Sequence, residues 1–186
     1  YYMINNTFNK NDYNSKDGML TSVWGPSLWH SLHTISFNYP IKPTQEQKKQ
    51  YFTFFKGLKH VLPCKYCRDN FKSNLKRVPL TRATMKNRET LSKWLYNLHE
   101  EINKMLGKKS NLSYTDVRNR YEMFRARCID EKKNVTKPRT QKKKREKGCT
   151  TPYYGKKSRC VINIVPKSKK CKSFKIDKKC IIKKQK

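Results

Sequence analysis

The chain has 186 residues, enough for one domain and an appendage. It carries 45 Lys and Arg against 13 Asp and Glu, a formal net charge of +32, and only 35% of its residues are hydrophobic. A balance this basic attracts nucleic acid, anionic membranes and acidic proteins alike, so it identifies no single partner. No stretch approaches 18 consecutive apolar residues, and we therefore expect no transmembrane helix.

The first twenty residues are polar, rich in Asn and Lys, and lack the apolar core of a signal peptide. We expect residues 1–20 to be a flexible lead. The chain begins with Tyr1 rather than Met, so whether a further segment precedes it stays open. This end of the sequence therefore constrains localisation only weakly.

Apolar periodicity predicts three helices in the first half of the chain. The first begins near Trp24, with apolar residues at spacings of three and four, and ends at the following Tyr-Pro pair. Thr44 and Gln47 have the spacing of a capping box that opens the second helix. That helix has an aromatic-rich face and is interrupted at Pro63, after which residues 65–76 predict a short third helix.

Two further segments complete an all-α pattern. Residues 91–106 keep a helical apolar stripe for four turns, and Gly107 is a natural stop for this fourth helix. Ser113 with Asp116 suggests the start of a fifth helix that extends to about Cys128. The fold class expected from the residues is therefore all-α.

The composition changes after the fifth helix. Residues 129–148 are nearly all polar or basic and predict a linker or a disordered run. Residues 149–186 form a Lys- and Cys-rich extension, in which two β-like pieces, 160–165 and 172–176, predict either a small β-hairpin or disorder. From residue 129 onward the chain holds 22 basic and 4 acidic residues, so the charge is concentrated there.

Seven cysteines are present, and only Cys64 and Cys67 form a close pair. A CxxC at a helix start is a two-electron switch, because the sulfurs can meet and the helix N-terminus lowers one thiol pKa. Half of a zinc site is a weaker alternative, since zinc takes four ligands, usually as two close pairs. A thioredoxin-like site would need a β-strand before the CxxC, whereas an aromatic helical segment precedes this one. A dithiol in a helical frame needs another electron acceptor.

Side chains on two predicted helices could hold such an acceptor. They are Gly25, Pro26, Trp29 and His33 on the first helix, and His99, Asn103 and Lys108 on and after the fourth. Together they supply flat aromatic surfaces, hydrogen-bonding rings and a cation, which a planar dinucleotide requires where no GxGxxG loop is available. Taken singly, a Trp or His on an amphipathic helix is more often part of a core than a ligand.

Three motifs in order resemble the Erv/ALR family of sulfhydryl oxidases. WGPSLWHSLH at residues 24–33 is similar to the family's WGxxxWxxLH signature, and PCKYCR at residues 63–68 follows it. HEEINKMLGK at residues 99–108 is similar to the family's HNxVNxxLGK stretch, and the segment at residues 121–128 looks most like members encoded by large DNA viruses. The resemblance covers roughly residues 20–128, and we take residues 21–128 as an oxidase domain.

The resemblance implies a bundle of four helices plus a short fifth, often a homodimer, with FAD bound inside. It implies that Trp29 and His33 lie against the flavin ring. The helix-four motif, with His99, Asn103 and Lys108, would hold the adenine, ribose and phosphate part.

The resemblance also implies a reaction. Cys64 would exchange with substrate and Cys67 would face the flavin, while Tyr121 falls near an aromatic that closes the adenine side. The expected activity is that of a FAD-linked thiol oxidase, which forms disulfides in reduced protein thiols and gives the electrons to oxygen, producing hydrogen peroxide. A viral origin would suggest the host cytoplasm and the virion as locations.

The sequence departs from the family pattern at three places. Glu100 replaces the Asn that usually follows the helix-four His, and Leu62 replaces an aromatic two residues before the first active cysteine. Tyr96 occupies the position expected for the first cysteine of a structural disulfide that ties helix four to the following loop. We therefore expect the core to be held by packing alone.

The role of the extension stays open. Cys149, Cys160, Cys171 and Cys180 could relay electrons from bulky substrates to the CxxC, or they could close a disulfide-stapled hairpin. The basic tail could also dock nucleic acid or acidic proteins. A purely nucleic-acid- or membrane-binding protein with structural cysteines is the main alternative from another class, and it explains the charge but not the three ordered motifs.

Overall fold

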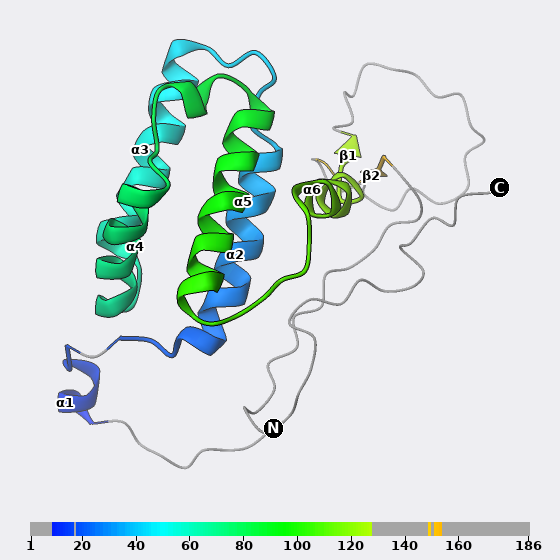
Figure 1. The fold of residues 1–186 in the computed structure, drawn as a ribbon. Coiled ribbons are helices and arrows are strands. Elements are labelled where there is room, and N and C mark those ends of the chain that lie inside the picture. The colour runs from blue at the N-terminus through cyan, green and yellow to red at the C-terminus, as the bar shows by residue number, and fades with distance from the viewer. Residues whose placement is uncertain (1–8, 17, 128–148, 150, 154–186) are drawn as a thin grey trace, which may run out of the picture.

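Four helices form a bundle that carries the core, and a fifth packs beside it (Figure 1). The computed structural model describes residues 9–16, 18–127, 149 and 151–153. The bundle consists of α2 (Thr21–Phe37), α3 (Gln45–Val61), α4 (Lys65–Arg77) and α5 (Arg88–Met105), with a short 3-10 turn, η1 (Ala83–Met85), before α5. The short α1 (Lys10–Tyr13) precedes the bundle. The all-α class expected from the sequence is confirmed.

The helices pack in a pattern that leaves α2 and α5 side by side. α2 packs on α5, α3 packs on α4, α4 also contacts α5, and α6 (Tyr114–Glu122) lies against both α2 and α5. The core consists of apolar side chains from all four bundle helices and η1, including Leu32, Phe55, Phe71, Met85 and Leu95. Because α2 and α5 carry two of the three motifs, their contact brings those motifs together.

Local capping explains where the helices begin and end. Thr44 and Gln47 form the predicted capping box, with the Gln47 amide donating to the Thr44 hydroxyl at 3.2 Å. Ser113 and Asp116 form a second predicted box at the start of α6. Gly107, with a φ of 65°, follows the end of α5 as predicted, because glycine adopts this backbone conformation without strain.

The fifth helix is shorter than the sequence predicted. α6 ends at Glu122 instead of continuing to about Cys128, and the chain turns there because Arg125 binds both the Glu122 carboxylate and the Phe37 carbonyl, the latter at 3.0 Å. Strand β1 (Ala126–Arg127) follows and pairs antiparallel with β2 (Thr151–Pro152). This pairing joins the start of the extension to the end of the domain.

A hydrogen bond joins α5 to the loop before α6, where the sequence predicted packing alone. The Tyr96 hydroxyl on α5 donates to the Leu112 carbonyl at 2.7 Å, and its ring meets that of Tyr114 edge to face. The tyrosine therefore clasps α5 to the loop before α6, which corrects the expectation that packing alone ties these segments together.

Several predicted features lie outside the described residues. They are the linker over residues 129–148, the hairpin over residues 160–176, and Cys128, Cys160, Cys171 and Cys180. Cys149 is described and is disulfide-bonded. In the part of the chain that the structure describes, no helix has the length and apolar character needed to cross a membrane.

Candidate functional site

The CxxC lies at the N-terminus of α4. α3 ends at Val61, and Cys64 is the N-cap of α4, with its sulfur accepting a hydrogen bond from the Cys67 backbone N–H at 3.3 Å. Both cysteines are half-buried free thiols. Pro63 cannot donate a backbone hydrogen bond, which favours the break between the two helices just before the pair. The sequence therefore places the sulfurs where the α4 dipole favours a thiolate.

The two thiols differ in acidity. A hydrogen bond from the Cys67 side chain is the largest of several that hold the pKa of Cys64 below its ordinary value, and burial opposes it. Burial raises the pKa of Cys67, and the nearby Cys64 thiol raises it further. Cys64 is thus the thiol that ionises first. A thiolate that forms readily and can be reached from solvent is suited to exchange with an external disulfide or thiol.

The segment before α2 lies directly against the CxxC. The Met19 backbone N–H donates to the Pro63 carbonyl at 2.8 Å, and a Cβ added to Gly18 would come within 2.6 Å of that oxygen. The Thr21 hydroxyl lies 3.8 Å from the Cys67 sulfur. Neither Gly18 nor Thr21 was predicted from the sequence to lie in the site. No local pattern connects them to a motif more than forty residues away.

Aromatic rings from α2, α5 and α6 form a second group. Trp29 stacks on His99 with ring centroids 3.8 Å apart, and His33 Nε2 lies 3.1 Å from His99 Nδ1. The Tyr121 ring lies 5.4 Å from that of His33 and stacks on Phe37 at 5.2 Å. Four residues predicted at long separation in the sequence, Trp29, His33, His99 and Tyr121, are therefore brought into one aromatic cluster.

The histidines of the cluster are neutral. The pKa of His33 is lowered to about 3, mainly by burial and in smaller part by the neighbouring His99 and His30 rings. Burial also lowers the pKa of His99 to about 4. In the pair, one ring must therefore donate its N–H and the other must accept. Among the described residues, His33 Nδ1 is the only buried side-chain nitrogen or oxygen atom with no hydrogen-bond partner.

Two cluster members were missed by sequence analysis. His30 Nδ1 lies 3.3 Å from the Tyr121 hydroxyl, and Phe37 stacks on the Tyr121 ring. Phe37 lies one helical turn after His33, so the same spacing that paired Trp29 with His33 could have found it.

The remaining predicted cofactor residues lie near the same two helices. Asn103 donates from its amide to Glu100 at 3.0 Å, so the residue that departs from the family pattern holds the Asn103 side chain. The Lys108 backbone N–H donates to the Asn103 carbonyl at 2.8 Å, and its side chain is exposed. Gly25 is buried and Pro26 is exposed on the first turns of α2.

The two groups are joined by α2. Thr21, beside Cys67, and His33, in the cluster, are twelve residues apart on this helix, which corresponds to about 18 Å. A dinucleotide in extended form bridges such a distance. The flat rings suit its planar bases, the unpartnered His33 Nδ1 suits a polar edge, and Lys108 suits a phosphate. The residues present therefore fit FAD, while the assignment of individual residues to its flavin and adenine ends stays a prediction.

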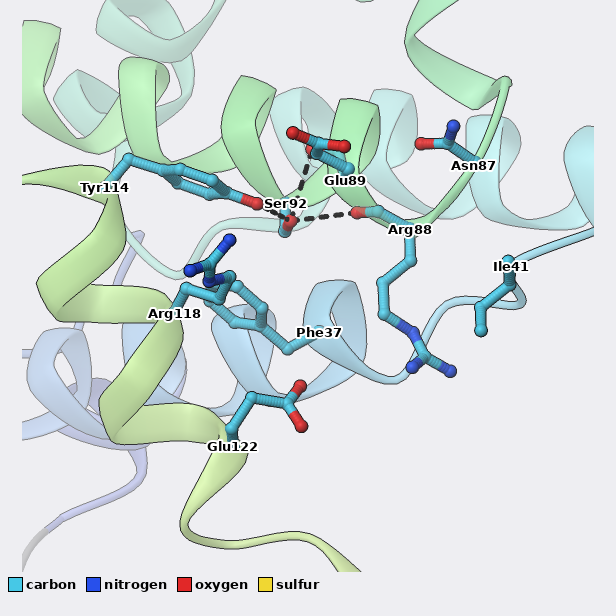
Figure 2. Close-up of a pocket in the computed structure, with 9 residues that line it drawn as sticks. All are labelled: Phe37, Ile41, Asn87, Arg88, Glu89, Ser92, Tyr114, Arg118 and Glu122. Carbon is cyan, nitrogen blue, oxygen red and sulfur yellow. Dashed lines mark hydrogen bonds between the residues drawn. The ribbon is translucent and has the colours of Figure 1, made fainter. Parts of the chain in front are cut away.

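A cavity of about 270 Å³ adjoins the cluster at Phe37, the last residue of α2 (Figure 2). Arg88, Arg118, Glu89 and Glu122 surround it, and Phe37, which lines it, also stacks on Tyr121. Ser92 closes one side through a hydrogen bond with the Tyr114 hydroxyl at 2.9 Å. Within the described residues, no cluster of His, Cys, Asp and Glu could hold a metal ion.

The model of the Erv1/Alr family matches residues 26–122, which contain the second and third motifs and all of the first except Trp24 and Gly25. The chain belongs to this family. Its domain is 42% identical over 99 residues to a probable FAD-linked sulfhydryl oxidase of Acanthamoeba polyphaga mimivirus, covering 53% of this chain and 68% of that protein. It is 30% identical over 107 residues to a FAD-linked sulfhydryl oxidase of African swine fever virus, covering 58% and 87% respectively.

A plant relative matches over less of its own length. A FAD-linked sulfhydryl oxidase of Arabidopsis thaliana is 38% identical over 84 residues, which are 45% of this chain and 42% of that protein. The crystal structure of the FAD-binding domain of Erv1 from Saccharomyces cerevisiae superposes with a TM-score of 0.50 at 27% identity, covering 55% of this chain and 94% of that domain. The crystal structure of the yeast Erv1 core superposes with a TM-score of 0.51 at 25% identity, covering 65% of this chain and 96% of that core. The resemblance inferred from the sequence is confirmed.

Proposed function

We propose that this protein is a FAD-linked sulfhydryl oxidase whose redox-active pair is Cys64 and Cys67. The observation that carries the proposal is the CxxC at the start of α4, with unequal thiols, joined by α2 to a partly buried aromatic cluster. FAD is the cofactor in the names of the viral and plant relatives and of the yeast FAD-binding domain. Family membership and this geometry support the same chemistry.

The exchange step uses the difference between the two thiols. In the oxidised enzyme, a substrate thiolate attacks the Cys64 sulfur, the Cys64–Cys67 bond breaks, and Cys67 leaves as a thiolate. A second substrate thiolate attacks the substrate sulfur of the mixed disulfide and releases Cys64. The substrate thus gains one disulfide, and the enzyme pair holds the two electrons. The Thr21 hydroxyl and the nearby Arg68 guanidinium stabilise the Cys67 thiolate.

Bound FAD would accept these electrons from the pair and pass them to oxygen, giving hydrogen peroxide. The chain's part is to bind and orient it. Trp29, His33, His99, Asn103 and Lys108, with Tyr121, Gly25 and Pro26, are the residues we assign to this task. The neutral histidines offer one donor and one acceptor without adding charge.

The test begins with a visible spectrum of the purified full chain, which should show a flavin band and release FAD on denaturation. Oxygen consumption with a dithiol reductant should then yield hydrogen peroxide. Cys64→Ser should abolish this oxygen consumption. The control Cys149→Ser, in the extension, should leave the oxidation of a small dithiol unchanged. A colourless, folded protein that gains no flavin absorbance with added FAD would refute the proposal.

We also propose an oligomeric state, a location and a role for the basic extension. The homodimer is expected from the family resemblance and is tested by sedimentation. The relatives from large DNA viruses agree with a viral origin, which makes the host cytoplasm and the virion the expected locations. Contact of the basic extension with nucleic acid or acidic proteins is expected from its charge.

A further inference from the structure

Four large apolar side chains stand exposed beside the CxxC. Tyr66 is 79% exposed, Met19 and Val61 are each 71% exposed, and Leu20 is 70% exposed. We call these four residues the apolar collar. Side chains of this kind exposed together on one surface commonly mark an interaction site.

The collar is close to the exchanging sulfur. Val61 and Tyr66 are three and two residues from Cys64, so their Cα atoms lie within about 11 Å of it. Met19 and Leu20 come from far away in the sequence, and the 2.8 Å hydrogen bond from Met19 to Pro63 holds them at the residue before Cys64. The collar thus combines two separate segments near one reactive atom.

The collar is also held in place. The Trp24 indole N–H donates to the Met19 carbonyl at 2.9 Å, so both backbone groups of Met19 are tied to the domain. Gly18 packs so closely that an added Cβ would lie 3.0 Å from the Cys64 Cα. A surface that is fixed before binding loses less conformational entropy when a partner binds.

The charge around the collar is positive. Lys65 is exposed next to Cys64, and Arg68 lies one turn further along α4, where it donates to the Leu62 carbonyl. The nearby acidic residue on α4, Asp69, is paired with Lys72 at 3.2 Å. A partner with acidic groups beside its apolar contact therefore meets complementary charge.

We propose that the apolar collar, together with Lys65, docks a protein segment whose reactive cysteine is flanked by apolar and acidic residues. The inference rests on the proposed function, because it takes Cys64 as the sulfur that forms the mixed disulfide. Docking holds the substrate thiolate in line with the Cys64–Cys67 bond, and the basic surface offsets the rise that acidic neighbours cause in the thiol pKa of the substrate.

The test measures the oxidation of three dithiol peptides by the full-length flavoprotein. In the first, the cysteines are flanked by Leu, Phe and Glu; in the second, Ser replaces Leu and Phe; in the third, Lys replaces Glu. The variant combines Met19→Ser with Tyr66→Ser. The matched control is Ile41→Ser, since Ile41 is also exposed but follows the opposite end of α2.

We expect the wild type to oxidise the first peptide with a kcat/KM about tenfold above that of the other two, mainly through KM. The collar variant should lose the preference for the first peptide over the second, while the control keeps it and dithiothreitol is oxidised at the wild-type rate by all three proteins. An equal kcat/KM for the three peptides would overturn the inference. So would a change from dimer to monomer in the collar variant, because the collar would then be an interface between copies. A wild type that oxidises no dithiol at all would instead refute the proposed function.

Discussion

Acidification should destabilise the fold through the histidine pair, of which His33 is buried and His99 partly buried. His33 and His99 are neutral in the folded protein, with pKa values of about 3 and about 4, whereas an exposed histidine has an ordinary value of 6.5. The unfolded chain therefore binds more protons below pH 6.5. The stability that these rings contribute is complete above that pH, and it declines as the pH falls toward the folded-state values.

The magnitude follows from the same shifts. Between pH 7.5 and pH 5.0, each ring with such a lowered pKa costs about 2 kcal/mol of unfolding free energy. Because the rings share one hydrogen bond, a single proton can lie between them, and the expected total is about 2–4 kcal/mol. The carboxyl pKa values of Asp116 and Glu122 are held below 3.8 and 4.5 by their hydrogen bonds to Ser113 and Arg125, so these groups keep their contribution in this pH window.

Urea unfolding followed by circular dichroism at both pH values measures the difference. His33→Asn should reduce the loss to about half, because one of the two buried rings is removed. The control His60→Asn removes an exposed histidine in the last turn of α3 and should leave the loss unchanged. An unfolding free energy at pH 5.0 within about 0.5 kcal/mol of that at pH 7.5 would show that the pair is not buried in its neutral form.

Three further outcomes test separate parts of the site. Gly25→Ala and Gly57→Ala should each raise stability by up to about 1 kcal/mol, since an added Cβ meets only an ordinary 3.6 Å contact at Gly25 and nothing within 4 Å at Gly57. Only Gly25→Ala should lower the FAD retained per chain, and equal retention would remove Gly25 from the cofactor site. Tyr96→Phe should cost about 1 kcal/mol in urea unfolding if its 2.7 Å hydrogen bond clasps α5 to the next loop. Cys64→Ser should show a long-wavelength absorption band from the Cys67 thiolate beside the flavin, and a band in Cys67→Ser instead would reverse the two roles.

The bundle could be predicted because its signals are local. The capping residues at Thr44 and Ser113 and the stop at Gly107 each act within one helical turn, and the structure has all three. The end of α6 could not be predicted in this way. It depends on Arg125 reaching the Phe37 carbonyl on another helix, and that contact exists only once the helices are packed.

The candidate site divides along the same line. Residues within a motif could be chosen from spacing, since His33 follows Trp29 by one turn. Contacts between residues of different motifs could not be predicted from spacing. The stacking of Trp29 on His99 joins residues that sequence analysis had assigned to opposite ends of the cofactor. Thr21 beside Cys67 is a contact between α2 and α4 with no sequence signature at all.

The Tyr96 clasp bears on how such a domain remains folded while it handles disulfides. A thiol oxidase operates in contact with reduced thiols, and a structural disulfide is open to exchange with any thiolate that reaches it. A tyrosine hydroxyl bound to a backbone carbonyl holds the same two segments without a bond that thiols can attack. Its contribution, about 1 kcal/mol, is smaller than that of most disulfides. Among the described residues, the free thiols are then Cys64 and Cys67. Within the described part of the domain, the free thiols thus lie together at the start of α4, beside the collar.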